Sequence, residues 1–383
     1  MDKFARVFIV LVGLVLCLLA FAAKASEIGV SDQEIVLGQS LGVTGPLAQM
    51  APDIVNGGKV YFDAVNANGG IHGRKVRTVV LDDGYDPART LKTARQLIED
   101  EKVFAFYNLT GTANVAAILP MLATEAQPVP LVGSLTGADG IRNPRMGNVF
   151  HVRASYEDEL EKLVEHLTTV GIKRMGVLWI NNGMGKDGMT GIEKAMKRHG
   201  IASYASVSIQ PDGSDADKAI AALREKEPQA IIMITTGTAT VSFIKGFNKV
   251  KKGMRFYALS VMGTQSAVKA LGPDGIGVVV TSVVPFPWSN SNPLAKEYQA
   301  AMRKAGYDNL SFLGFEAYIN AKVVAEAIRR AGKDLTRAKF NTAMESMRDL
   351  DLGGFHLSFS KNQHQGSRFV ELTIIRDGER FTK

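Results

Sequence analysis

Short apolar runs alternate along the chain with longer segments in which apolar residues recur at helical spacing. In the first half, the runs that predict strands lie at 34–41, 75–82, 103–107, 129–132 and 149–152. The segments that predict helices lie at 53–66, at 86–101 and from residue 115 onward. Strict alternation of strand and helix predicts an α/β fold with parallel, doubly wound sheets.

A second alternating series follows the first. A helix is predicted at 157–170, and the next strands are predicted at 175–180, 203–209, 230–235, 256–259 and 277–283. Helices are predicted between the first four of these strands, at 187–199, 215–226 and 239–250. After them come predicted helices at 294–305, 312–331 and 335–347, and strands near 355–359 and 368–376. The chain therefore reads as two Rossmann-like halves of similar size.

Two strand-to-helix turns in the first half combine glycine with hydroxyl side chains. One turn carries Gly111 and Thr112, and the other carries Ser134 and Thr136 at positions i and i+2. In an open α/β sheet, turns at the carboxyl ends of strands line the crevice where ligands bind. The free N–H groups of helix starts suit a carboxylate or another anion there. The same hydroxyls are also typical helix caps, so the pattern leaves both binding and capping open.

The first 25 residues have the pattern of a secretory signal peptide. Lys3 and Arg6 precede a continuous apolar run at 7–23, and an A-x-A site predicts cleavage after Ala25. An uncleaved membrane anchor is the alternative, but the run is just short of a typical membrane span. We therefore expect an exported protein that begins at Ser26 and resides in the periplasm.

Composition and charge narrow the range of functions. The 383 residues suggest about two domains, and 46% hydrophobic with 22% charged residues is typical of a globular protein. The net charge is +7, but the densest basic runs, 249–252 and 329–330, are short and lack interleaved aromatics. A solvated surface is the better interpretation, so we expect no nucleic-acid partner. Cys17 is the only cysteine and lies in the signal, so the mature chain cannot use thiol chemistry.

One motif suggests an enzyme. Residues 183–188 match G-x-G-x-x-G after a predicted strand, and Asp212 lies 24 residues beyond Gly188. Asp212 follows Pro211 instead of ending a strand, and an exported protein meets little nicotinamide cofactor. A glycine-rich loop at a cleft is therefore favoured over an oxidoreductase. The six histidines show no ligand spacing, and the sequence has no G-x-S-x-G elbow and no G-x-x-x-x-G-K-[ST] loop. We therefore expect no enzyme activity, no cofactor and no metal.

Several short motifs, in their order and spacing, resemble the solute-binding proteins of ABC importers. They are Thr44-Gly45-Pro46, the segment 66–73 (NANGGIHG), Asp82-Asp83 with Asp86-Pro87, and the 134–136 loop. The family is the leucine-binding-protein-like, branched-chain amino-acid, amide and urea class, and the resemblance covers almost all of the mature chain. It implies a type I periplasmic binding fold, with two Rossmann-like lobes joined by a three-crossing hinge.

The resemblance also implies where the lobes and the ligand lie. Lobe one would comprise 27–152 plus 284–352, and lobe two 153–283 plus 353–383. The ligand would be held between lobes that close around it like a Venus flytrap. The ligand-binding positions carried over are Gln49, Met50, Gly111, Thr112, Ser134, Leu135, Thr136, Asn181, Met184, Thr236, Gly237 and Ser260.

This sequence departs from the amino-acid binders at Ser260, which falls where those proteins carry an acid for the ligand ammonium. Glu316 is the nearby acid that could substitute for it. We therefore expect a ligand with a carboxylate or amide-like end but no strongly held ammonium. The expected role is capture of this small organic molecule and delivery to the ABC permease subunits of an inner membrane. A ligand-sensing module acting on a receptor or regulator is the alternative.

Overall fold

The computed structural model describes residues 27–124, 128–142, 145–201, 204–376 and 380–383. The predicted signal peptide and its cleavage site lie outside the described residues. Within the described part of the chain, no helix has both the length and the apolarity needed to cross a membrane.

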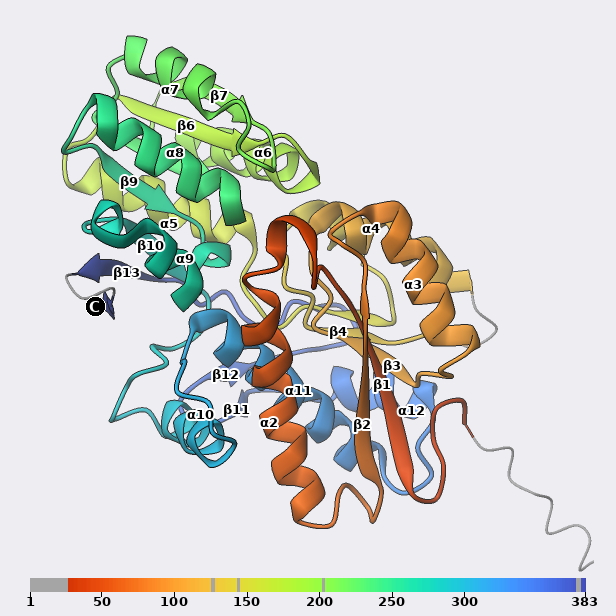
Figure 1. The fold of residues 1–383 in the computed structure, drawn as a ribbon. Helices are drawn as coiled ribbons and strands as arrows, with labels where there is room; N and C mark the ends of the chain where they lie inside the picture. The colour runs from red at the N-terminus through yellow and green to blue at the C-terminus, as the bar shows by residue number, and fades with distance from the viewer. Residues whose placement is uncertain (1–26, 125–127, 143–144, 202–203, 377–379) are drawn as a thin grey trace, which may run out of the picture.

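The first sheet contains five parallel strands in the order β2-β1-β3-β4-β5. Figure 1 shows α3 and α4 on one side of this sheet, and α2 with α11 on the other. The elements of this part are β1 (Glu34–Leu41), α2 (Ala51–Ala67), β2 (Lys75–Asp82), α3 (Pro87–Glu99), β3 (Ala105–Tyr107), α4 (Thr112–Thr124), β4 (Leu131–Val132) and β5 (Val149–Phe150).

The second sheet has the order β14-β13-β10-β9-β8-β6-β7. Its strands β6 to β10 are parallel, whereas β13 and β14 are added antiparallel at one edge. Helix α5 packs on α6, and α7 packs on α8. The elements are α5 (Tyr156–Thr169), β6 (Met175–Ile180), α6 (Gly183–Arg198), β7 (Ala205–Ile209), α7 (Ala216–Glu225), β8 (Ala230–Ile234), α8 (Gly237–Val250), β9 (Arg255–Ala258), α9 (Gln265–Leu271), β10 (Val279–Ser282), β13 (Glu371–Arg376) and β14 (Arg380–Thr382).

The chain passes between the two sheets three times. It leaves the first sheet after β5, returns after β10 to form three helices and a small ribbon, and then joins the second sheet at β13. These returning elements are α10 (Pro293–Lys304), α11 (Phe312–Ala331), α12 (Arg337–Glu345), β11 (Leu350–Asp351) and β12 (His356–Leu357). The predicted fold, with two α/β lobes and a three-crossing hinge, is confirmed.

We use lobe one for the first sheet with α2–α4 and α10–α12, and lobe two for the second sheet with α5–α9. The residue boundaries given above for the lobes stay a prediction. The first and third crossings lie side by side, because the His151 amide donates to the His364 carbonyl at 2.8 Å and the His151 carbonyl accepts from Gly366 at 2.7 Å.

Aromatic rings surround the second crossing. The Trp288 ring lies 5.5 Å from that of Phe312 at the start of α11, and 5.9 Å from that of Phe381 in β14. Phe286 completes the cluster at 5.1 Å from Trp288. The crossing therefore packs against both lobes at once.

Polar residues before the helices explain where many of them begin. The Asp86 carboxylate accepts from the amides of Ala88 and Arg89, with Pro87 as the first helical residue. Ser155 and Asp158 form a capping box at α5. Such caps supply acceptors for N–H groups that have no partner inside the helix.

Three helices differ most from the prediction. Helix α4 begins at Thr112 instead of residue 115, and α6 begins at Gly183 instead of residue 187. Glycine disfavours helix, but the Asn182 side chain accepts from the amides of Met184 and Gly185 and so stabilises the first turn of α6. The seven-residue helix α9 was not predicted, because it is too short to show a clear helical period.

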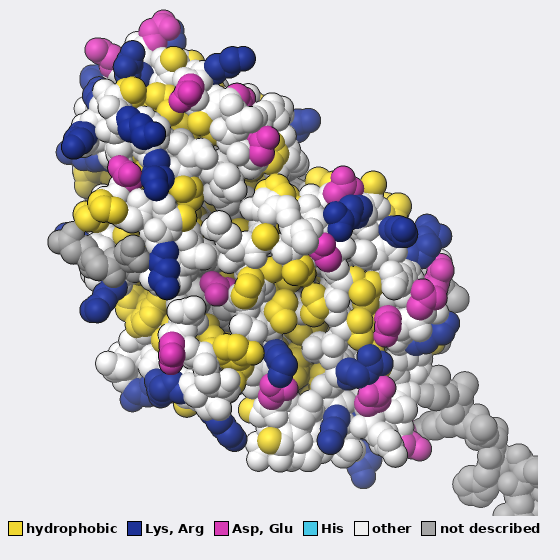
Figure 2. Space-filling model, viewed as in Figure 1, with side chains coloured by type: hydrophobic (Ala, Val, Ile, Leu, Met, Phe, Trp, Pro, Cys, Tyr) yellow, Lys and Arg dark blue, Asp and Glu magenta, His cyan; other side chains and the backbone are white. Residues whose placement is uncertain are grey.

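The charged surface agrees with a solvated exterior. Figure 2 shows Lys and Arg side chains interspersed with Asp and Glu over the visible face of both lobes. Apolar side chains are also buried where the lobes meet. A small cluster lies at the carboxyl end of the first sheet, formed by Leu41, Leu47, Met50, Ala51, Ile54, Leu135, Leu313 and Ala317. We call it the apolar floor.

Candidate functional site

The loops at the carboxyl ends of both sheets meet between the lobes. The Ser266 hydroxyl of lobe two donates to the Gln49 carbonyl of lobe one at 2.9 Å. The Thr236 hydroxyl of lobe two lies 3.7 Å from the Met50 sulfur. A cavity of about 80 Å³ opens beside these contacts, lined from both lobes by Gln49, Met50, Gly237, Thr238, Val261 and Met262, among others. The structure therefore brings together Gln49, Met50, Thr236 and Gly237.

A pair of hydroxyls marks the lobe-one side of the cleft. The Oγ1 atoms of Thr112 and Thr136 lie 2.7 Å apart, and both side chains are buried. Thr136 also accepts from the Ala138 amide at 3.3 Å and is hydrogen-bonded to the Tyr156 hydroxyl. Among the described hydrogen bonds, neither hydroxyl caps a helix. The hydrogen bonds therefore argue against the capping interpretation for Thr112 and Thr136. Their role in ligand binding stays a prediction.

Gly111 lets an aromatic ring approach the hydroxyl pair. Its φ is +87°, and a Cβ there would lie 2.6 Å from the Tyr85 ring. Any side chain at Gly111 would therefore displace this ring. The Tyr85 hydroxyl lies 3.5 Å from the Asn182 Nδ2 of lobe two. Sequence reasoning left out Tyr85 and Tyr156, although both stand beside motifs that it singled out.

Ser134 and Leu135 face other partners. The Ser134 hydroxyl lies 3.5 Å from the His151 Nδ1, not beside the Thr112–Thr136 pair. His151 is buried, and burial together with the nearby Arg142 and His364 lowers its pKa well below the ordinary value, so the ring is neutral. Leu135 belongs to the apolar floor. A role for Ser134 and Leu135 in ligand binding stays a prediction.

On the lobe-two side, Asn181 and Met184 differ in position. Asn181 is exposed, and its amide donates to the Ile209 carbonyl at 2.8 Å. Met184 is buried in the first turn of α6. Of the two adjacent asparagines, Asn182 is the one that reaches across the cleft.

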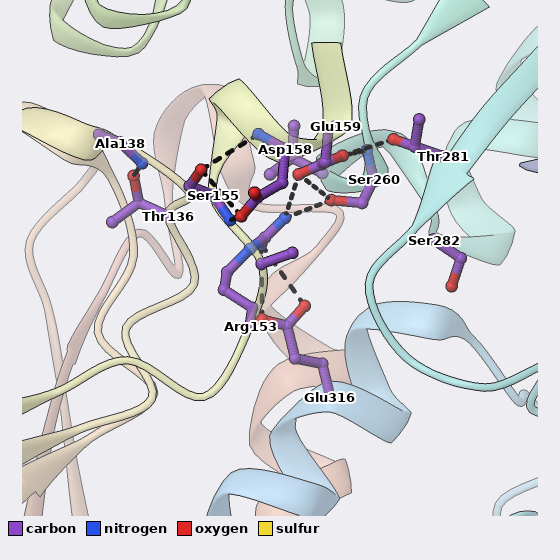
Figure 3. A network of polar contacts seen from close by, with 12 residues as sticks. Thr136, Ala138, Arg153, Ser155, Asp158, Glu159, Ser260, Thr281, Ser282 and Glu316 are labelled. Carbon is purple, nitrogen blue, oxygen red and sulfur yellow. Dashed lines mark hydrogen bonds and ion pairs between the residues drawn. The ribbon is translucent and has the colours of Figure 1, made fainter. Parts of the chain in front are cut away.

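Ser260 lies in a buried charged network centred on Arg153, shown in Figure 3. Arg153 stands on the first crossing and is 1% exposed. Its Nη2 donates to the Glu159 Oε1 at 2.9 Å and to the Ser260 hydroxyl, both in lobe two. Its Nη1 lies 3.4 Å from the Glu316 Oε1 on α11 of lobe one. One guanidinium thus joins the two lobes inside the cleft.

The Glu159 carboxylate is fully engaged within the network. Besides Arg153, it accepts from the Ser260 amide at 2.8 Å, from the Ser260 hydroxyl at 3.0 Å and from the Thr281 hydroxyl. Four donors are what a buried carboxylate needs to compensate for lost hydration. Glu159 could have been suspected from the sequence, since it falls at helical spacing with the buried residues Tyr156, Leu160 and Leu163.

Glu316 is less well satisfied. It is 2% exposed, and within the described residues its Oε1 has no hydrogen bond, although it is ion-paired with Arg153. Burial raises the pKa of Glu316 to about 7, against the opposing effect of Arg153. For Arg153, burial alone would lower the pKa, but the Glu316 and Glu159 carboxylates outweigh it and raise the pKa. The network holds one cation and two acids, one of which titrates near neutrality.

A further contact joins the lobes at the edge of the cleft. The Asp187 carboxylate in α6 accepts from the amide of Asp139 at 2.9 Å and from that of Gly140 at 2.8 Å. Two backbone donors on one carboxylate make a charge-assisted clamp. We call this contact the Asp187 clamp.

The glycines of the 183–188 motif are explained by packing. A Cβ at Gly185 would lie 1.8 Å from the Ile180 carbonyl oxygen, and a Cβ at Gly188 would lie 2.4 Å from Ile234. These glycines let α6 lie close to β6 and β8. This packing accounts for the motif without a bound dinucleotide. In the part of the chain that the structure describes, no group of three or more His, Cys, Asp or Glu side chains could hold a metal ion.

Comparison with known proteins gives a consistent result. The model of a periplasmic binding protein family matches residues 34–379. A Leu/Ile/Val-binding protein homolog of Brucella melitensis is 23% identical over 94% of this chain and 96% of its own. The crystal structure of a substrate-binding periplasmic protein of Ralstonia solanacearum is 31% identical, covers 90% of this chain and 98% of its own, and has a TM-score of 0.83.

A third match has a different ligand in its description. A fatty acid ABC transporter substrate-binding protein of Thermomonospora curvata shares the fold with a TM-score of 0.81. It is 20% identical over 91% of this chain and 90% of its own.

Proposed function

Because the chain belongs to the periplasmic binding protein family, we propose that it captures a small organic ligand between its two lobes and delivers it to an ABC permease. The observation that carries this proposal is that lobe two contacts both the Thr112–Thr136 pair, through Tyr156, and the apolar floor, through Thr236. The pair offers hydroxyl donors, and the floor offers an apolar wall. This combination of few polar groups and an apolar lining is typical of ligand sites.

The proposed ligand carries a carboxylate or amide-like end attached to an apolar body. Hydroxyls at Thr112 and Thr136 can donate to the polar end, and Met50, Leu135 and Tyr85 can pack against the body. Relatives described as binding Leu/Ile/Val or fatty acid support a ligand with a carboxylate. We further propose that the protein works in the periplasm as a non-catalytic partner of membrane permease subunits.

The experiment is a thermal-shift screen of small carboxylates, amides and amino acids, followed by calorimetry on the hits. A ligand at about 100 times its dissociation constant should stabilise the protein by about 2.7 kcal/mol. Paired Thr112→Val and Thr136→Val substitutions keep the shape but remove both hydroxyls. They should cost about 1.5–3 kcal/mol per lost hydrogen bond to a charged group, or at least about tenfold in affinity.

The matched control is Thr190→Val, which removes an exposed hydroxyl on α6. Its affinity should equal that of the unchanged protein. Unchanged affinity in the Thr112/Thr136 double variant would contradict the proposed role of the pair. Delivery is tested by adding the loaded protein to vesicles that contain the permease together with its ATPase subunits, where it should stimulate ATP hydrolysis.

A further inference from the structure

We propose that the guanidinium of Arg153 is a built-in cation that occupies the place a ligand ammonium would need, so that the cleft selects carboxylates without a neighbouring amino group. This inference rests on the proposed function, because it concerns the choice of ligand in the same cleft. Arg153 is then a specificity-determining residue.

The first step is the position of the guanidinium. It contacts Ser260 and Glu159 on the lobe-two side and Glu316 on the lobe-one side, so it lies between the lobes. Figure 3 shows Glu316 rising from α11 toward Arg153, with Ser260 and Glu159 on the opposite side of the guanidinium. A cation is thus already enclosed where the two lobes meet.

The second step connects this cation with the proposed carboxylate site. The Arg153 guanidinium carbon lies 5.8 Å from the centre of the Tyr156 ring. The Tyr156 hydroxyl bonds to Thr136, which in turn bonds to Thr112. Tyr156 therefore contacts the Thr112–Thr136 pair through its hydroxyl and the guanidinium through its ring, and so links the proposed carboxylate site to the cation.

The third step asks which carboxylate could pair with a ligand ammonium. An enclosed ammonium needs an acid partner, because an unpaired charge in a closed cleft loses its hydration. Glu159 already accepts from four donors. The free acceptor capacity of Glu316 is at Oε1, which lies 3.4 Å from the Arg153 Nη1. An ammonium bound there would lie beside a like charge at low dielectric, which is strongly unfavourable. A hydroxyl, a carbonyl or a methylene group meets no such repulsion.

The test uses matched carboxylates that differ in the group beside the carboxylate. Leucine is compared with 4-methylpentanoate and its 2-oxo analogue, and phenylalanine with 3-phenylpropanoate and its 2-oxo analogue. In calorimetry, the unchanged protein should bind at least one amino-free member about tenfold or more tightly than its amino acid. Tighter binding of the amino acids would overturn the inference while leaving the proposed function intact.

Substitution of Arg153 provides the second arm. In Arg153→Ala, the preference for the amino-free ligand should fall by about tenfold or more, because two acids are left without their cation. Arg153→Lys keeps a cation and should keep the preference. If all three proteins bind carboxylates with the same preference, Arg153 does not set specificity and the inference is wrong.

Two further measurements guard against a folding defect in Arg153→Ala. The double variant Arg153→Ala/Glu316→Gln removes both members of the interlobe pair and leaves no lone charge in that pair. Glu159 is then the one acid of the network left without its cation, so the preference should still fall, but by less than in Arg153→Ala. Methylguanidinium should raise the melting temperature of Arg153→Ala more than an equal concentration of potassium does, and should have no such effect on the unchanged protein. Equal effects of the two cations would contradict a cation site.

Failure of the proposed function would look different. If neither carboxylates nor amides bind to the unchanged protein, the proposed function is contradicted and the inference falls with it.

Discussion

Glu316→Gln should make the stability of the protein less dependent on pH. The carboxyl group is buried between α11 and Arg153, and burial raises its pKa from 4.5 to about 7. A folded-state pKa above the unfolded value means that the folded protein binds this proton more tightly. The stabilisation is fully present below about pH 4.5 and is lost as the pH rises through about 7. Glutamine has the shape of the protonated acid and does not titrate in this range.

The magnitude follows from the two pKa values. The interval between 4.5 and about 7, at 1.36 kcal/mol per pH unit, corresponds to about 3 kcal/mol. Relative to the unchanged protein, Glu316→Gln should therefore gain up to about 3 kcal/mol of unfolding free energy between acidic and mildly alkaline pH. The gain should develop between about pH 4.5 and pH 8 and level off above it.

The assay is urea unfolding of the ligand-free protein at several pH values across this range. Glu326→Gln is the matched control, because Glu326 lies on the same helix but pairs at the surface with Arg329 and Arg330. Surface pairs contribute only about 0–1 kcal/mol, so this variant should follow the unchanged protein closely. If Glu316→Gln is instead less stable at mildly alkaline pH, the attraction between Glu316 and Arg153 outweighs burial and the reasoning is refuted.

Three further predictions concern the clamp, the packing of α6 and export. Asp187→Ala removes both acceptors of the Asp187 clamp, so small-angle scattering of the ligand-free protein should give a larger radius of gyration; an unchanged radius would show that other contacts suffice. Gly188→Ala places a Cβ 2.4 Å from Ile234 and should lower the unfolding free energy by about 1–3 kcal/mol, whereas Gly200→Ala, in open space but with φ +68°, separates backbone strain from crowding. N-terminal sequencing of the exported protein should begin at Ser26, and an intact Met1 would contradict cleavage.

Local signals were enough to predict most of the fold. The bounds of β1, β2 and β6 agree with the apolar runs, because polar or glycine residues interrupt the pattern at each end. The antiparallel addition of β13 could not be predicted, since strand direction within a sheet depends on contacts made far along the chain.

One part of the candidate site was predicted from residues that are neighbours in the sequence, namely the glycine and hydroxyl residues of two turns. Thr112 and Thr136 were found from glycine and hydroxyl spacing, and the structure brings them together. Ser134 stands two residues before Thr136, and residues i and i+2 share a face only where the chain has strand geometry. Gly133 has a φ of +65°, so the chain leaves strand geometry at that point and the rule no longer applies.

The contacts of Ser260 and Glu316 with Arg153 could not be predicted for another reason. Ser260 and Glu316 are 107 and 163 residues away from Arg153 along the chain. Each is unremarkable in its own segment, and only the three-crossing topology brings them into contact. Glu316 was named as a candidate acid, but its pairing with an internal arginine had no local signature.

The aromatic cluster at the second crossing places an intrinsic fluorophore, Trp288, at the hinge. The indole of Trp288 packs against a lobe-one ring, Phe312, and a lobe-two ring, Phe381, which also contact each other. We expect bending of the hinge to change the overlap of these rings and hence the emission of the indole, whereas Trp179 lies in strand β6 and should give a constant background. Rearrangement of the two lobes can then be followed in the unlabelled protein through the emission wavelength and intensity of its tryptophan fluorescence.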